Sequence, residues 1–129
     1  PWRVMIIGES GSGRSGAARS LVEHWRRERG HLARRLVVVD HDEVPHEANF
    51  DDDDLDVIAT VDPLALRHSF DHWAHAVRRH RTGLLLGNAV NDHADLLGVA
   101  PPPRPYAIAP GRGEWVQHGI AMGIVQVTV

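Results

Sequence analysis

The sequence predicts an α/β fold in which helices pack on a mostly parallel sheet. Short apolar runs rich in β-branched residues alternate with segments of helical periodicity, which is typical of such layered folds. The 129 residues suit a single domain over residues 1–129 with a real core, and are too few for two domains. The chain is 43% apolar and 24% charged, as ordinary soluble globular proteins are.

Charge and cysteine content exclude several classes of protein. The net charge of -3 gives no general attraction to nucleic acid. The absence of cysteine excludes disulfides and thiolate metal sites. No apolar run approaches the ~18 residues that a membrane helix needs. Because the chain starts at Pro1 and shows no signal peptide, we expect a cytosolic domain cut from a larger protein, with no membrane insertion of its own.

A glycine-rich turn joins the first predicted strand, Arg3 to Ile7, to the first predicted helix, Arg14 to Arg29. It matches the P-loop pattern G-x-x-x-x-G-K-[ST], except that Arg14 stands at the lysine position. Backbone N–H groups and the positive end of the helix would bind phosphate, and the Ser15 hydroxyl would ligate Mg²⁺. The alternative is a plain Gly/Ser turn. The residues predicted to bind ATP are Gly8, Glu9, Ser10, Gly11, Ser12, Gly13, Arg14, Ser15 and Gly16.

The second predicted strand, Leu36 to Asp40, is apolar until its last residue. Continuous apolar strands are typical of parallel sheets that are buried on both faces. A strand that ends in aspartate resembles a Walker B element, whose carboxylate reaches Mg²⁺ beside the P-loop. We therefore predict Asp40 as a metal ligand and catalytic residue; the alternative is a strand that simply ends at a polar loop. The acidic run 51–54 that follows favours a solvated loop over a calcium site.

Two further strands are predicted at Leu55 to Val61 and Leu84 to Leu86. A helix between them begins at Asp62-Pro63, with aspartate as N-cap and proline at the first helical position. His68, His72 and His75 lie on this helix at a spacing that could hold a metal ion. In a chain with ten histidines, a partly exposed helix face is the better interpretation.

The C-terminal part of the sequence differs in composition from the rest of the chain. A proline-rich connector at 101–105 and a turn at 110–113 precede Glu114 to Gln117, then His118-Gly119, then a run from Ile120 to Val127. This pattern predicts a β-hairpin that adds strands at the edge of the sheet.

With these pieces in place, the chain resembles the FtsK/SpoIIIE family of motor ATPases, and most of all the last ATPase module of EccC-type proteins of type VII secretion. The resemblance spans nearly the whole chain. It rests on the glycine-rich turn and Val37-Val38-Val39-Asp40, and on the segment from His72-Trp73 through Arg78-Arg79-His80-Arg81 to Leu84-Leu85-Leu86. Asp95-Leu96-Leu97-Gly98, Pro110-Gly111-Arg112-Gly113 and the closing Val125-Gln126-Val127 complete it.

The resemblance implies a three-layer, RecA-like P-loop NTPase core with ATP and Mg²⁺ as cofactors. It also implies a cytoplasmic motor in which this module works with other ATPase modules, in a ring. The last module of such proteins is associated with docking the C-terminal helix of small secreted substrates.

The sequence departs from the active family pattern in three ways. Asp40 and Asp56 are close in sequence, whereas the family usually has a further helix between those strands, so this helix is shortened or absent here. Arginine is a wide planar fork, so Arg14 cannot take the seat of the lysine between the β- and γ-phosphates. His41 occupies the place of the carboxylate that polarises the attacking water. Asp42 and Glu43 are the candidate substitutes, but neither is in register. We therefore expect a degenerate ATPase module with weak or no hydrolysis. The alternatives are a non-catalytic P-loop-fold domain that docks a partner subunit or an export-substrate helix, and a small-molecule kinase, for which no lid or substrate clamp is visible.

Overall fold

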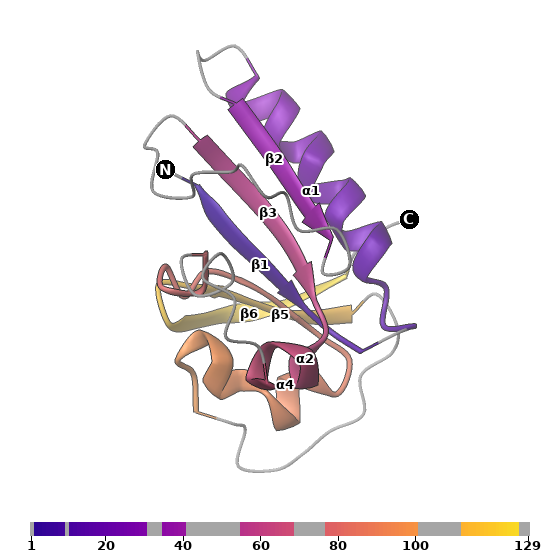
Figure 1. Ribbon diagram of the computed structural model, residues 1–129, viewed down its shortest axis with the longest axis vertical. Helices are drawn as coiled ribbons and strands as arrows, with labels where there is room; N and C mark the ends of the chain where they lie inside the picture. Colours follow the sequence, from indigo (N-terminus) through magenta and orange to yellow (C-terminus); the bar gives the residue numbers. More distant parts are fainter. Residues whose placement is uncertain are drawn as a thin grey trace.

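The computed structural model describes residues 2–9, 11–30, 35–40, 55–68, 77–100 and 112–126. These residues form one six-stranded sheet in the order β2-β3-β1-β4-β5-β6 (Figure 1). The first four strands in that order run parallel, and β5 and β6 are antiparallel additions at one edge. The predicted α/β class and the hairpin at the sheet edge are thus confirmed. The strands are β1 Arg3–Ile7, β2 Arg35–Asp40, β3 Leu55–Val61, β4 Gly83–Leu86, β5 Arg112–Gln117 and β6 Ile120–Gln126.

Helices lie on both faces of the sheet, so that the fold has three layers. α1 Arg14–Arg29 runs alongside β2 and β3, whereas α2 Pro63–His68 and α4 Ala89–Asp92 lie next to each other at the lower end of the view in Figure 1. A 3₁₀ turn, η1 Ala94–Leu97, follows α4. α2 begins as the sequence predicts, because Asp62 Oδ1 accepts a 2.9 Å hydrogen bond from the Leu64 N–H.

Alternate residues of each central strand enter two separate core clusters, because successive side chains of a strand point to opposite faces. On the face of α2 and α4 the cluster is built around Met5, Ile7, Val57, Ala59, Leu66, Leu85 and Val90. On the face of α1 it is built around Ile6, Ala17, Ile58, Leu84 and Leu86. β1 and β3 are fully buried along their whole length and form the rigid centre of the domain.

The expectation that the second strand is buried on both faces was wrong. β2 is an edge strand that pairs with β3, and Val38 on it is 50% exposed. The apolar run was correctly read as a strand, but a run of apolar letters does not distinguish an edge strand from a central one. α4 and η1 were not predicted either, since each holds only four residues. Arg112 and Gly113 belong to β5 rather than to a turn.

Several predicted features lie outside the described residues. They include His41, Asp42, the acidic run 51–54, the proline-rich connector 101–105, and the helix positions of Phe70, His72, Trp73 and His75. Val77, which follows these positions, is fully buried in the core. Among the described residues, no three metal-ligating side chains gather into a metal site. No helix in the described part of the chain has the length and apolar character to cross a membrane.

Candidate functional site

The candidate site begins where the central strand β1 ends. The Gly8 N–H donates a 3.2 Å hydrogen bond to the carbonyl of Val61, the last residue of the neighbouring strand β3. Gly8 is packed so closely that a Cβ there would collide with the Ser12 Oγ and press against Leu86. The loop therefore starts at the carboxyl edge of the parallel strands, where open α/β sheets bind their ligands.

A tight turn folds the loop back toward the sheet. The Ser12 N–H and Oγ both donate to the Glu9 carbonyl, at 3.1 and 2.6 Å. Gly11 and Gly13 have φ angles of +84° and +99°, which L-residues with a side chain rarely adopt. Gly13, a fixed glycine of the P-loop pattern, and Gly11, at one of its variable positions, thus both stand where the backbone has a positive φ.

The loop leads directly into an uncapped helix. Gly13 is the residue before α1 and gives no side-chain cap, and the first turn carries no acidic residue. The first hydrogen bond within the helix runs from the Ala17 N–H to the Gly13 carbonyl, at 2.9 Å. The N–H groups of the first turn are therefore not used inside the helix, and the helix dipole adds partial positive charge there. This end of α1 has the chemistry of an anion site.

The side chains of the first turn complete the site. Ser15 is exposed and Arg14 is half-buried. Arg14 has no hydrogen bond or ion pair with the described residues. A serine hydroxyl and an arginine guanidinium at the start of the helix fit Mg²⁺ and phosphate oxygens, respectively.

Asp40 is the last residue of β2 and reaches the same edge of the sheet. β3 lies between β2 and β1, and Thr60 of β3 is in register with both Asp40 and Ile6. One strand, β3, thus separates the strand that leads into the loop from the strand that ends at Asp40. The structure describes the backbone of Asp40 but not its side chain, and Ser10 and Asp42 lie outside the described residues.

Thr60 is a polar residue of this edge that the sequence did not reveal. It is 7% exposed and lies between the loop strand and the strand of Asp40. The only available signal was a threonine near the end of an otherwise apolar strand. The sequence does not show which strands are neighbours, so it could not place Thr60 beside the site.

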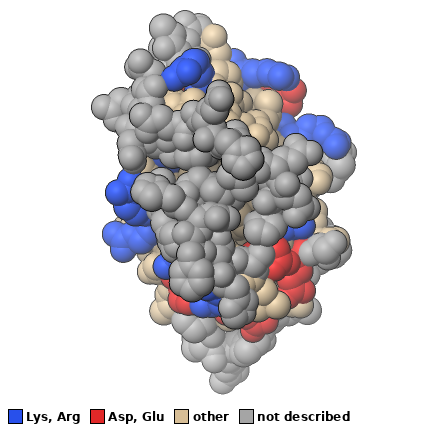
Figure 2. Space-filling view, in the orientation of Figure 1, with Lys and Arg blue, Asp and Glu red and all other residues tan. Residues whose placement is uncertain are grey.

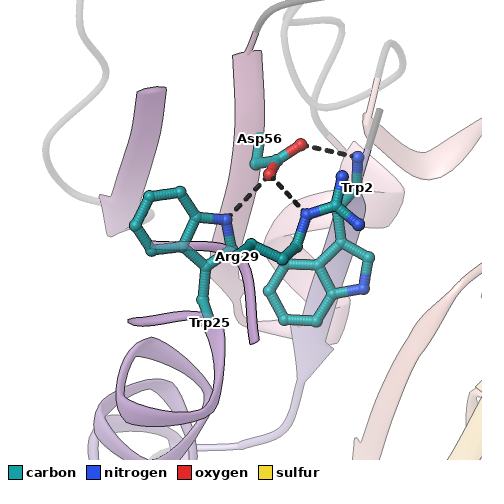
Figure 3. Close-up of polar contacts among 4 residues, drawn as sticks. All are labelled: Trp2, Trp25, Arg29 and Asp56. Atoms are coloured by element: carbon teal, nitrogen blue, oxygen red, sulfur yellow. Dashed lines mark hydrogen bonds and ion pairs between the residues drawn. The ribbon is translucent and has the colours of Figure 1, made fainter. Parts of the chain in front are cut away.

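A second polar cluster lies at the opposite, amino-terminal edge of the sheet (Figure 3). The fully buried carboxylate of Asp56 accepts hydrogen bonds from the Trp2 backbone N–H at 2.8 Å, from Trp25 Nε1 at 2.7 Å and from Arg29 Nε at 3.0 Å. The sequence predicted no partner for Trp25 or Arg29. Their spacing of four residues on one helix face was the signal that they share a partner.

The described cavities also lie away from the glycine-rich loop. One, of about 370 Å³, is lined by Arg78, Arg79, Arg81 and Asp95, among others. A hydrogen bond from Arg67 to Asp95, 2.6 Å long, lowers the pKa of that carboxyl. The other cavity, of about 140 Å³, includes Trp115 in its lining. Trp115 is half-buried against the core on the α1 face, so only part of its side chain could contact a docked partner.

Comparison with known proteins places the fold. No protein-family model and no curated protein matches the chain. Two solved structures are similar, both with a TM-score of 0.55: EssC (ATPases 2 and 3) from Geobacillus thermodenitrificans, at 12% identity, and the cytoplasmic domain of EssC, at 13% identity. Each match covers 98% of this chain but only 31% and 34% of the EssC chains, so this chain spans about a third of their length. The three-layer α/β architecture with its mostly parallel sheet is the fold of an EssC ATPase domain.

Proposed function

We propose that this chain is a nucleotide-binding module of an FtsK/SpoIIIE-like, EccC-type secretion motor, with Mg²⁺ and ATP at the Gly8–Ser15 loop. The observation that carries the proposal is the uncapped N-terminus of α1, preceded by two glycines of positive φ and placed directly after the central strand. Free N–H groups at such a helix end bind phosphate without further help. The likeness of the fold to EssC ATPase domains supports the same assignment.

The residues of the site define what each would contribute. The loop backbone and Arg14 would hold the phosphates, and Ser15 with Asp40 would hold Mg²⁺, which supplies charge neutralisation at the phosphates. Arginine at position 14 offers charge but not the compact geometry of lysine. We therefore propose that the module binds nucleotide and hydrolyses it weakly or not at all.

The same comparison supports a motor context. The Geobacillus EssC structure holds ATPases 2 and 3, and the match covers about a third of that chain. We propose that other ATPase modules of a cytoplasmic motor, arranged as a ring, are its partners. Nucleic acid is not favoured by the net charge of -3, and the described arginines visible in Figure 2 lie at separate places on that face.

Calorimetric titration of Mg²⁺-ATP into the wild-type protein tests the assignment. Arg14→Ala should weaken binding about tenfold or more, since a hydrogen bond to a charged group contributes ~1.5–3 kcal/mol. Arg19→Ala is the matched control, because Arg19 is an exposed arginine of the same helix. Saturable binding that only Arg14→Ala weakens supports the proposal. A wild-type protein that gives no binding heat at any tested temperature, and no protection by ATP in a thermal melt, contradicts it.

A non-catalytic interaction domain is the second candidate, and the edge strand β6 favours it. Ile120, Met122 and Ile124 of this strand are 64%, 59% and 46% exposed. Apolar side chains on an unpaired edge are a typical contact surface for another protein. On this reading the edge would meet a neighbouring module or an export-substrate helix. Replacing the three residues by serine should abolish that association and leave ATP binding unchanged, which separates the two functions.

A further inference from the structure

A small polar cavity lies at the amino-terminal edge of the sheet, opposite the glycine-rich loop. It has a volume of about 140 Å³, and its lining includes Trp2, Arg3, His80, Thr82, Trp115 and His118. These residues come from the start of β1, the segment before β4, and the β5–β6 hairpin. Three elements distant in sequence therefore build one cavity.

Thr82 links the two backbone segments that carry the histidines of the cavity. Its hydroxyl donates a 3.2 Å hydrogen bond to the His80 carbonyl and accepts a 3.1 Å hydrogen bond from the His118 N–H. Thr82 is 7% exposed, and both bonds are partly buried. The Gly119 N–H also donates to the Arg81 carbonyl at 2.9 Å, which fixes the hairpin turn against the segment before β4. The cavity is thus preorganised by the fold.

The lining includes one guanidinium group, that of Arg3. Arg3 is only 2% exposed, and none of the described lining residues carries a carboxylate. Burial lowers the pKa of His80, and the charge of Arg3 lowers it further. An anion that entered the cavity would raise the pKa of this imidazole again, because an opposite charge nearby favours the protonated, charged form.

The cavity also presents hydrogen-bond donors that the described part of the fold does not use. The indole N–H groups of Trp2 and Trp115 make no hydrogen bond among the described residues, and neither do the imidazoles of His80 and His118. Indole nitrogen is a donor only, and an imidazolium donates from both nitrogens. A complementary ligand must therefore be rich in acceptors.

The volume of the cavity limits the size of the ligand that it can hold. Pockets for drug-sized ligands and cofactors measure ~300–1,000 Å³, well above the 140 Å³ found here. We propose that this cavity is a binding site for a small oxyanion, the size of a phosphate or a carboxylate group, held by the two histidines and the two indoles. The site is separate from the nucleotide loop and does not depend on the function proposed for it.

NMR of the histidine imidazoles in the whole chain tests the proposal, with inorganic phosphate and acetate as probes at constant ionic strength. Phosphate or acetate should shift the His80 and His118 signals in a saturable way. We expect half-saturation at about 1 mM, which corresponds to a binding free energy of about −4.1 kcal/mol. The pKa of His80 should rise in the presence of the anion. The signal of His93, which accepts a hydrogen bond from Arg67 elsewhere, is the internal control. Saturation by phosphate alone identifies a phosphate site, and saturation by acetate identifies a carboxylate site.

Variants make the assignment specific. The double variant His80→Gln/His118→Gln should weaken anion binding at least fivefold, whereas His93→Gln should leave it unchanged. If the double variant loses its fold, Trp115→Phe removes one donor, retains an aromatic ring, and should weaken binding about threefold, by analogy with one lost hydrogen bond. Shifts that stay linear in anion concentration, are equal for His93, and match those in sodium chloride would overturn the proposal.

Discussion

Trp25 Nε1 donates a 2.7 Å hydrogen bond to Oδ2 of Asp56, a carboxylate with no exposure to solvent. The same oxygen accepts from Arg29 Nε, and the other oxygen accepts from the Trp2 backbone N–H. This single side chain therefore joins the start of β1, the start of β3 and the last turns of α1. It closes the amino-terminal edge of the sheet, at the opposite end from the glycine-rich loop.

Asp56→Asn should destabilise the protein by about 2 kcal/mol, because an amide has only one acceptor oxygen for the three N–H donors that the buried carboxylate satisfies. Urea unfolding followed by circular dichroism measures the loss. Glu23→Gln is the control: its ion pair with Arg26 is 3.2 Å long, but both side chains are more than 60% exposed. Loss of such a pair should change stability by no more than about 0.5 kcal/mol. Equal effects of the two substitutions would show that the Asp56 cluster does not tie the three elements together.

The sequence predicted the architecture well because its strongest signals are local. The runs that became β1, β3 and β4 are short, apolar and bounded by polar or glycine residues, and α1 was predicted with its observed bounds. The glycine-rich turn is also local: Gly11 and Gly13 lie within one eight-residue stretch of the sequence, and both adopt the positive φ that glycine permits.

What the sequence did not reveal depends on contacts between distant segments. Asp56 and Arg29 are 27 positions apart, and Thr82 and His118 are 36 apart. No periodicity within one element reports such a pair. The edge position of β2 was missed for a similar reason, since the neighbours of a strand are set by the order in the sheet and not by its own residues. Burial of Arg3 at 2% exposure contradicts the general preference of arginine for the surface.

Gly83→Ala should disrupt the junction of β1 and β4. Gly83 pairs with Met5, and a Cβ at position 83 would collide with the Met5 carbonyl oxygen. Relief of this clash requires the two central strands to separate, so we expect a loss of about 3 kcal/mol or more in the free energy of unfolding. Chemical denaturation gives the total loss, and hydrogen exchange at the Met5 amide, which donates to Thr82 at 3.1 Å, locates it. A cost below about 1 kcal/mol would contradict the register between β1 and β4.

His80 should make stability depend on pH. Its pKa in the folded protein is below the ordinary 6.5, first because of burial and then because of the charge of Arg3. The folded state therefore binds fewer protons than the unfolded state near that pH, so the contribution of His80 to stability is present above pH 6.5 and is lost as the pH falls toward the folded pKa. Comparison of unfolding free energies of wild type and His80→Gln across this window isolates the effect. The wild type should lose more stability than the variant as the pH falls; parallel curves would show that His80 is not the group responsible.

Arg14→Lys should convert a weak nucleotide site into a better catalytic one. All 14 basic residues counted as lysine or arginine in this chain are arginines, so the substitution introduces its only lysine side chain. Lysine is compact enough to approach the phosphate oxygens between which charge develops, and one such electrostatic contact is worth about 10²-fold in rate.

We expect slow ATP hydrolysis by the wild type and an increase of about tenfold or more in Arg14→Lys, measured as phosphate release under single-turnover conditions. The introduced lysine also reports directly on the site, because Mg²⁺-ATP should protect this amine from acetylation whereas adenosine should not. Arg19→Lys, on the exposed part of the same helix, should gain neither activity nor protection and serves as the matched control. Protection without faster hydrolysis would show that the loop binds phosphate and that catalysis is limited elsewhere, with His41 in the place of the expected carboxylate as the next residue to change. An unprotected lysine and an unchanged rate would contradict the assignment of this loop to nucleotide.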